Sequence, residues 1–134
     1  MLKILQKLGA CADCSSNAEI YLAKKAGIND LIYSGIYYSK EDLEYGVKND
    51  IKINLDNTDK LNYLASLGVK EVCFRLNPGI GNGKYNQIVT AGKEAKFGII
   101  EEDLLNAYRE AKKLGFNKFG IHMMGCVNLI NGRR

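Results

Sequence analysis

Short apolar segments begin near residues 10, 31, 51 and 71 of this chain, and an amphipathic segment follows each of them. This spacing of about 20 residues is typical of a repeated strand–helix unit. Strands that alternate with helices form a parallel sheet with right-handed crossovers. The sequence therefore predicts an α/β fold. The period alone leaves two architectures open, an open doubly wound sheet and the curved wall of a barrel.

The length of the chain limits the second architecture. The chain has 134 residues, which is the usual size of one domain. A complete barrel of eight strand–helix units takes at least about 200 residues. A curved sheet in this chain is therefore only part of a barrel wall.

Local patterns predict where the helices and strands lie. Residues 16–19 and 39–42 each have the spacing of a capping box, which marks the start of a helix. In the helix that follows residue 16, we expect Ala18, Leu22 and Ala26 to form a buried stripe. Strands are expected over 10–14, 31–34, 51–55, 71–76 and 119–123.

Composition and charge exclude several classes of function. The net charge is +4 at pH 7, but the Lys and Arg residues are scattered rather than gathered in a stripe, which argues against a nucleic-acid partner. No apolar run approaches the roughly 18 residues of a membrane span, so we expect no membrane partner. Four cysteines without a secretion signal indicate reduced thiols and a cytoplasmic protein.

Polar residues stand where the predicted strands end, and parallel α/β folds carry their function at the carboxyl ends of the strands. Asp13 could accept a hydrogen bond from a ligand or balance a cation there. His122, the only histidine, could contact a ligand or be a structural hydrogen-bonding residue. Arg75 lies in an apolar strand and needs an acceptor if it is buried. That acceptor is Glu71 or Asp56, unless Arg75 holds an anion.

Two local motifs do not predict a site. Cys11 and Cys14 have the spacing of a redox or zinc motif, but on a strand their side chains point to opposite faces. No further paired ligands complete a zinc set, so we interpret them as buried thiols and expect no metal. Residues 79–84 are rich in glycine but lack the spacing and the following helix of a phosphate-binding loop. They belong to a loop of about 20 residues, a length that favours a lid or binding loop.

Six segments, taken together in their order and spacing, resemble the diaminopimelate decarboxylases. These enzymes belong to the fold-type III pyridoxal-phosphate group, with ornithine and arginine decarboxylases. The resemblance implies a partial pyridoxal-phosphate-binding (β/α)8 TIM-like barrel domain over residues 1–134, roughly strands 2 to 6 of the barrel. The most discriminating patterns are Arg-x-Asn-Pro-Gly, Lys-Phe-Gly and Gly-Ile-His, which favour the diaminopimelate branch. The six segments are 12–19, 32–35, 53–56, 75–79, 92–98 and 119–123.

The resemblance also implies a cofactor and the residues that bind it. The parent enzyme would use pyridoxal 5′-phosphate to convert meso-diaminopimelate to L-lysine and carbon dioxide. Asp13 matches a family aspartate that lines the cofactor, and His122 belongs to the same cofactor-binding set. Met124 stands where the family has a ring-stacking residue. Gly125 and Cys126 stand where it has a phosphate-binding Gly-Ser pair, with one residue lost between stacker and pair.

No catalytic residue is expected within the chain. In the family, the lysine that holds the cofactor belongs to a segment that would precede Met1. The proton-donor cysteine belongs to a C-terminal β-domain of the partner subunit, and that domain is expected to be absent here. Residues 127–134 depart from the family pattern, which indicates an interrupted or shifted reading frame. We therefore expect a fragment that is inactive alone, from a homodimeric enzyme that acts on a small amino acid.

Two alternatives stay open. A related decarboxylase with the same fold would act on ornithine, arginine or carboxynorspermidine. A non-catalytic half-barrel would instead be an interaction module and would melt cooperatively as a single species. Unpaired strand edges near 10–14 and 119–123 predict self-association, which argues against this second alternative.

Overall fold

The computed structural model describes residues 1–78 and 97–124, and six strands form one sheet within them. The strands β1 to β4 lie side by side in chain order, and β5 and β6 both pair with β4. Every one of these pairings is parallel. The elements are α1 (Leu2–Lys7), β1 (Ala12–Cys14), α2 (Asn17–Lys25), β2 (Leu31–Tyr33), α3 (Lys40–Lys48), β3 (Lys52–Leu55), α4 (Leu61–Ser66), β4 (Glu71–Asn77), β5 (Ile99–Ile100), α5 (Glu101–Lys113) and β6 (Lys118–Met123).

The five predicted strands are all present, and a sixth was not predicted. That strand, β5, has only two residues, which is too short to produce an alternating pattern in the sequence. It pairs with the end of β4, where Leu76 lies beside Ile99 and Asn77 beside Ile100.

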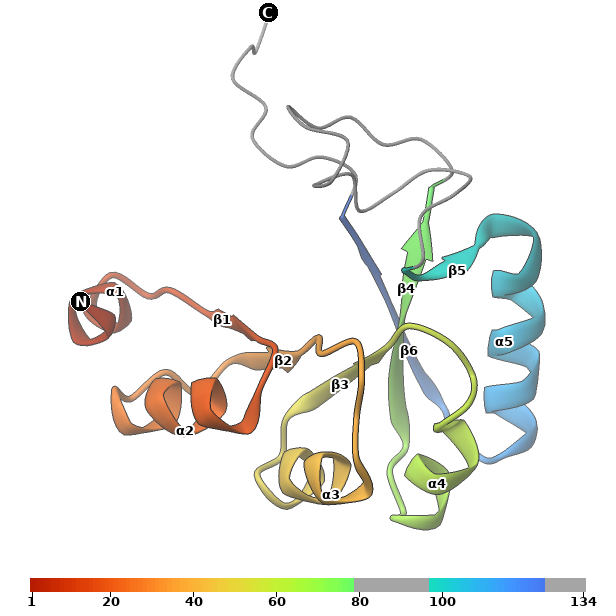
Figure 1. The fold of residues 1–134 in the computed structure, drawn as a ribbon, viewed down its shortest axis with the longest axis horizontal. Helices are drawn as coiled ribbons and strands as arrows, with labels where there is room; N and C mark the ends of the chain where they lie inside the picture. The colour runs from red at the N-terminus through yellow and green to blue at the C-terminus, as the bar shows by residue number, and fades with distance from the viewer. Residues whose placement is uncertain (79–96, 125–134) are drawn as a thin grey trace, which may run out of the picture.

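The helices α2 to α5 lie along one side of the sheet, and the strands fan out around the other side (Figure 1). A doubly wound sheet carries helices on both faces, so this arrangement is the curved wall of a partial barrel. Within the described residues, β1 pairs only with β2, and β6 only with β4. The sheet is therefore not closed in this part of the chain.

Side-chain caps begin α2 and α3 where the sequence predicted. Ser39 and Asp42 form a complete capping box at the start of α3. At the start of α2, the Ser16 hydroxyl accepts from the Glu19 amide at 3.3 Å. The Glu19 carboxylate bonds the amide of Ser15 at 2.7 Å rather than that of Ser16. Half of the predicted capping box is thus replaced by a bond one residue earlier.

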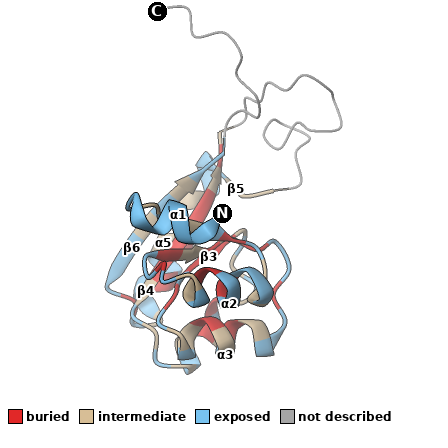
Figure 2. Ribbon diagram, turned by 90° about the vertical axis from the view of Figure 1, so that its left-hand side faces the viewer, coloured by how far each residue is buried: buried red, intermediate tan, exposed pale blue. Residues whose placement is uncertain are grey.

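The core lies between the sheet and its helices (Figure 2). Its largest fully buried side chains include Phe74, Leu43 and Leu61. The stripe predicted for α2 was wrong, because Leu22 is 52% exposed and the buried residues are Ile20 and Ala23. The stripe of Ala18, Leu22 and Ala26 has the same helical period as Ile20 and Ala23 but lies on another face. The helical period alone therefore does not predict which of these two faces packs against the sheet.

The helix α1 is the part that packs least. None of its residues is buried, and Figure 2 shows it as an exposed helix. Among the described helices, none is both long enough and apolar enough to cross a bilayer.

The Tyr38 hydroxyl joins two strands. This buried oxygen lies 2.8 Å from the Tyr33 carbonyl and 2.7 Å from the Asn54 carbonyl, and it shares its proton between them. The Tyr33 and Tyr38 rings meet edge to face, with centroids 4.9 Å apart. The hydroxyl therefore ties the end of β2 to β3 beneath the loop that follows β2.

We expect Tyr38→Phe to lower the free energy of unfolding by about 1–3 kcal/mol, because it removes a donor from buried carbonyls. The control is Tyr37→Phe at the neighbouring position, which is 89% exposed and should change stability by less than about 0.5 kcal/mol. Urea unfolding of the two variants checks the difference. Equal losses of unfolding free energy in the two variants would show that the buried Tyr38 hydroxyl contributes no more to stability than the exposed Tyr37 hydroxyl.

Candidate functional site

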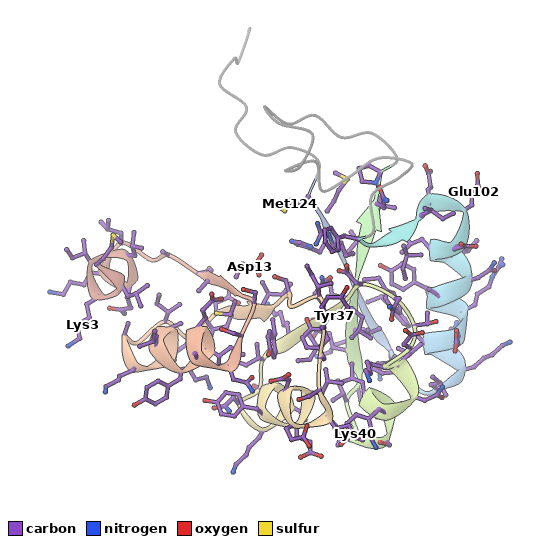
Figure 3. All side chains as sticks on the ribbon, in the orientation of Figure 1. Lys3, Asp13, Tyr37, Lys40, Glu102 and Met124 are labelled. Atoms are coloured by element: carbon purple, nitrogen blue, oxygen red, sulfur yellow. The ribbon has the colours of Figure 1, made fainter. Side chains whose placement is uncertain are left out.

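The carboxyl ends of the strands bring polar side chains together on the face away from the helices. Side chains alternate between the two faces of a strand, and in the β4–β6 pair Arg75 lies directly beside His122. Asp13 lies on β1, and Met124 follows β6 at the same end of the sheet (Figure 3). Asp56 follows β3. We call this group the strand-end cluster: Asp13, Ser34, Asp56, Arg75, His122 and Met124.

Asp13 and His122 meet across the concave face. Their Oδ2 and Nε2 atoms are 3.7 Å apart, although β1 and β6 lie at opposite ends of the described sheet. Asp13 also accepts a hydrogen bond from the Ser34 hydroxyl. The curvature of the sheet therefore makes the strand ends converge on one mouth.

Arg75 and Asp56 form a buried ion pair. The Nη1 and Oδ1 atoms are 3.9 Å apart, and the side chains are only 8% and 7% exposed. Of the two acceptors that the sequence offered for Arg75, the structure selects Asp56 rather than Glu71. Burial raises the pKa of the Asp56 carboxyl, and the charge of Arg75 opposes that rise. The two opposite charges thus balance each other inside the mouth.

Phe97 and Gly98, the last two residues of the Lys-Phe-Gly motif, support this pair, which reasoning from the sequence did not foresee. The Phe97 ring lies 5.4 Å from the guanidinium carbon of Arg75, within the range of a cation–π contact. The Gly98 amide donates to Asp56 Oδ2 at 3.1 Å. The only signal for these roles was the position of the motif in the family resemblance.

Met124 lies near the same guanidinium, with its sulfur 3.9 Å from Arg75 Nη2. The structure therefore gathers Asp13, His122 and Met124 at one end of the sheet. Gly125 and Cys126 lie outside the described residues, as does the glycine-rich stretch 79–84. The cofactor roles of all five predicted residues stay predictions.

Several buried polar atoms in this region have no hydrogen-bond partner. They are both side-chain atoms of Asn54, Oδ1 of Asp56 and Nδ1 of His122. Leaving a buried donor or acceptor unpaired costs about 1–3 kcal/mol, and native proteins hold few such groups. Donors and acceptors that lack a hydrogen bond, grouped around one mouth, suit a polar ligand, and of these only Asp56 Oδ1 has a counter-charge, from Arg75. These hydrogen-bonding atoms therefore fit a cofactor with a polar aromatic ring.

A pocket of about 500 Å³ opens beside Asp56, between the loop after β2 and the loop after β3. Tyr37, Tyr38 and Gly98 are among its lining residues. This volume is within the usual range for a small-molecule site. Figure 3 labels Tyr37, which belongs to the loop after β2.

The three cysteines in the described part of the chain do not form a second centre. Cys11, Cys14 and Cys73 are free, and the pKa of each thiol is raised, so none is a stabilised thiolate. For Cys11 the main cause is a hydrogen bond to Asp30, whereas for Cys14 and Cys73 it is burial. Cys11 is exposed, which corrects the interpretation of both thiols as buried. No group of three or more metal-ligating side chains occurs in the described part of the chain.

Comparison with known proteins identifies relatives of this chain. Residues 1–125 match the family model described as pyridoxal-dependent decarboxylase, pyridoxal binding domain. Diaminopimelate decarboxylase of Methanothermobacter thermautotrophicus is 32% identical over 126 residues, which cover 91% of this chain and 29% of the relative. The Helicobacter pylori J99 enzyme of the same name is 36% identical over 124 residues, or 87% of this chain and 31% of the relative. The chain thus spans about three tenths of the length of these relatives.

Solved structures agree with the sequence relatives. Diaminopimelate decarboxylase from Helicobacter pylori, complexed with L-lysine, superposes with a TM-score of 0.84 at 34% identity, covering 91% of this chain and 33% of that one. Lysine decarboxylase from Selenomonas ruminantium shares the fold, with a TM-score of 0.76 at 20% identity over 92% of this chain and 32% of that one. Because residues 1–125 match that family model, the chain belongs to the pyridoxal-dependent decarboxylase family, in the region of its pyridoxal binding domain.

Proposed function

We propose that this chain is the pyridoxal-phosphate-binding part of a diaminopimelate decarboxylase. The observation that carries the proposal is the convergence of Asp13 and His122 at 3.7 Å, across the mouth of a pyridoxal-binding fold. Relatives named for this activity match nearly the whole chain. The substrate of the parent enzyme is then meso-diaminopimelate, and its products are L-lysine and carbon dioxide.

The residues present fit the cofactor. Bound pyridoxal phosphate supplies a ring that accepts the electrons left behind when carbon dioxide departs. Asp13 offers a carboxylate at the mouth, and His122 keeps Nδ1 without a partner in the described structure. The Met124 thioether is suited to contact an aromatic ring. Gly125 and Cys126 complete the set that we propose, and they would hold the phosphate group.

The side chains around this mouth are held in fixed positions, so that they orient a charged ligand. Asp13 is held from both sides, by the Ser34 hydroxyl and by His122, so its carboxylate has a defined direction. Asp56 is fixed by the Gly98 amide and by the charge of Arg75. A site whose groups are held before the ligand enters loses less entropy on binding.

The broader setting is part of the proposal. We assign residues 1–134 to one partial barrel domain and expect the parent enzyme to bind a small amino acid, as the L-lysine complex of the Helicobacter pylori relative supports. We propose that the parent is a homodimer. The free thiols of Cys11, Cys14 and Cys73 support a reducing compartment such as the cytoplasm.

Complementation of a bacterial strain that lacks diaminopimelate decarboxylase tests the proposed function. We expect the full-length gene to restore growth without lysine. The same gene with Asp13→Ala, made at an equal soluble level, should restore growth at least about tenfold more slowly, since it loses a charged hydrogen-bonding group at the mouth. Rescue of a polyamine-requiring strain instead would assign the protein to ornithine or arginine.

A further inference from the structure

Asn54 is a buried amide that the folded chain does not use. Its side chain is 0% exposed, and neither Nδ2 nor Oδ1 has a hydrogen-bond partner. Its backbone carbonyl accepts from the Tyr38 hydroxyl at 2.7 Å. An apolar residue of similar shape would avoid the cost of burying these two polar atoms.

The register places Asn54 on the concave face. Its neighbour Ile53 packs closely against Gly46 of α3, so Ile53 faces the helices. Successive residues of a strand point to opposite faces, and Asn54 therefore faces the inside of the barrel wall, as does Asp56 two residues later. Asn54 lies beside Cys73 on β4, and Cys73 lies beside Gly120 on β6. This row is one step below the row of Asp56, Arg75 and His122.

Asn17 shows the ordinary alternative for a part-buried amide in this molecule. Its Nδ2 donates to Asp42 Oδ1 at 2.7 Å, which links the start of α2 to the start of α3, and only its Oδ1 lacks a hydrogen-bond partner. That amide has a structural role, whereas the amide of Asn54 has none in the described structure. Asn54 also differs in position, because it lies directly beneath the strand-end cluster.

We propose that Asn54 is a ligand-binding residue whose amide hydrogen-bonds a pyridoxal-type ring in the mouth. This inference rests on the proposed function. An amide both donates and accepts, which suits the adjacent oxygen and nitrogen groups of such a ligand. The protein thus carries an unsatisfied amide that lowers the stability of the free chain and gains its partner on binding.

The test measures urea unfolding of the 134-residue chain with increasing pyridoxamine 5′-phosphate, which has no aldehyde to react with surface lysines. The stabilisation at each concentration gives the dissociation constant of this probe. We expect Asn54→Leu and Asn54→Ala each to raise that constant about tenfold. Without the probe, Asn54→Leu should unfold no more readily than the wild type. The control, Asn17→Leu, should unfold more readily and bind the probe with the wild-type constant.

The dissociation constant decides the inference. Equal constants for the wild type and both Asn54 variants would overturn it and leave the proposed function intact. A chain that gains no stability from the probe would overturn the proposed function, and this inference with it. A second readout separates binding from structure: if Asn54→Leu destabilises the free chain as much as Asn17→Leu does, the amide has a structural partner.

Discussion

Replacing Arg75 with leucine should lower the free energy of unfolding by about 3–5 kcal/mol, the usual cost of removing one partner from a buried ion pair. The pair with Asp56 is almost fully enclosed, with side-chain exposures of 8% and 7%. Losing Arg75 leaves the carboxylate buried without a counter-charge. Equilibrium unfolding in urea at neutral pH measures the loss. A loss below about 1 kcal/mol, typical of an exposed pair, would contradict this account.

The pH dependence identifies the cause of that loss. Burial raises the pKa of Asp56 in the folded chain above its ordinary value, so the folded state takes up a proton more readily than the unfolded state. Stability contributed by this group is present below the unfolded pKa, near 4, and is lost as the pH rises through the folded value. Arg75→Leu removes the charge that opposes the rise, so its folded pKa increases further. The variant should therefore lose least in acid and most above the raised pKa.

The double variant Arg75→Leu/Asp56→Asn is the matched control for charge. Asparagine keeps an oxygen that can accept from the Gly98 amide, which now bonds Asp56 at 3.1 Å, but it carries no charge. We expect the double variant to be more stable than Arg75→Leu alone by about 1–3 kcal/mol and to lose the added pH dependence. If the second substitution destabilises further, the cost of Arg75→Leu comes from lost packing and not from an unpaired carboxylate.

The architecture was largely predictable because it follows from local chemistry. The capping box at Ser39 appears as predicted, and the strands over 31–34 and 71–76 need only short apolar runs. The curvature was not predictable from the residues alone. Helices on one face and helices on both faces give the same alternation of strand and helix, so only the family resemblance favoured a barrel.

The gathering of polar residues at the strand ends was predictable, but the contacts among them were not. The rule that function lies at the carboxyl ends of parallel strands selected Asp13, Arg75 and His122. It could not show that Asp13 would meet His122, because that contact depends on how far the whole sheet bends. The unpaired amide of Asn54 was equally hidden, since a sequence records a polar residue in a strand but not whether that residue finds a partner.

Gly98→Ala should be the second large loss, because this glycine meets two requirements at once. Its φ is +83°, a backbone conformation that costs an alanine about 1–2 kcal/mol. An added Cβ would also lie 2.9 Å from the Arg75 carbonyl oxygen and 3.0 Å from the Asn77 amide nitrogen. Both atoms belong to β4, which cannot move aside without breaking its pairing with β5. Overpacking of this kind costs a further 1–3 kcal/mol, about 2–5 kcal/mol in total.

Gly68 provides the matched comparison. Its φ of +80° is nearly the same, but an added Cβ there meets no atom within 4 Å. Gly68→Ala should therefore cost only the conformational share, about 1–2 kcal/mol, and the difference between the two variants isolates the contact with β4. Displacing Gly98 also pulls its amide from Asp56 and shifts Phe97 away from Arg75. Gly98→Ala should thus weaken pyridoxamine 5′-phosphate binding in the unfolding assay, whereas Gly68→Ala should not. Equal losses of stability and binding in both variants would show that the tight approach of residues 97–98 to β4 does not support the mouth.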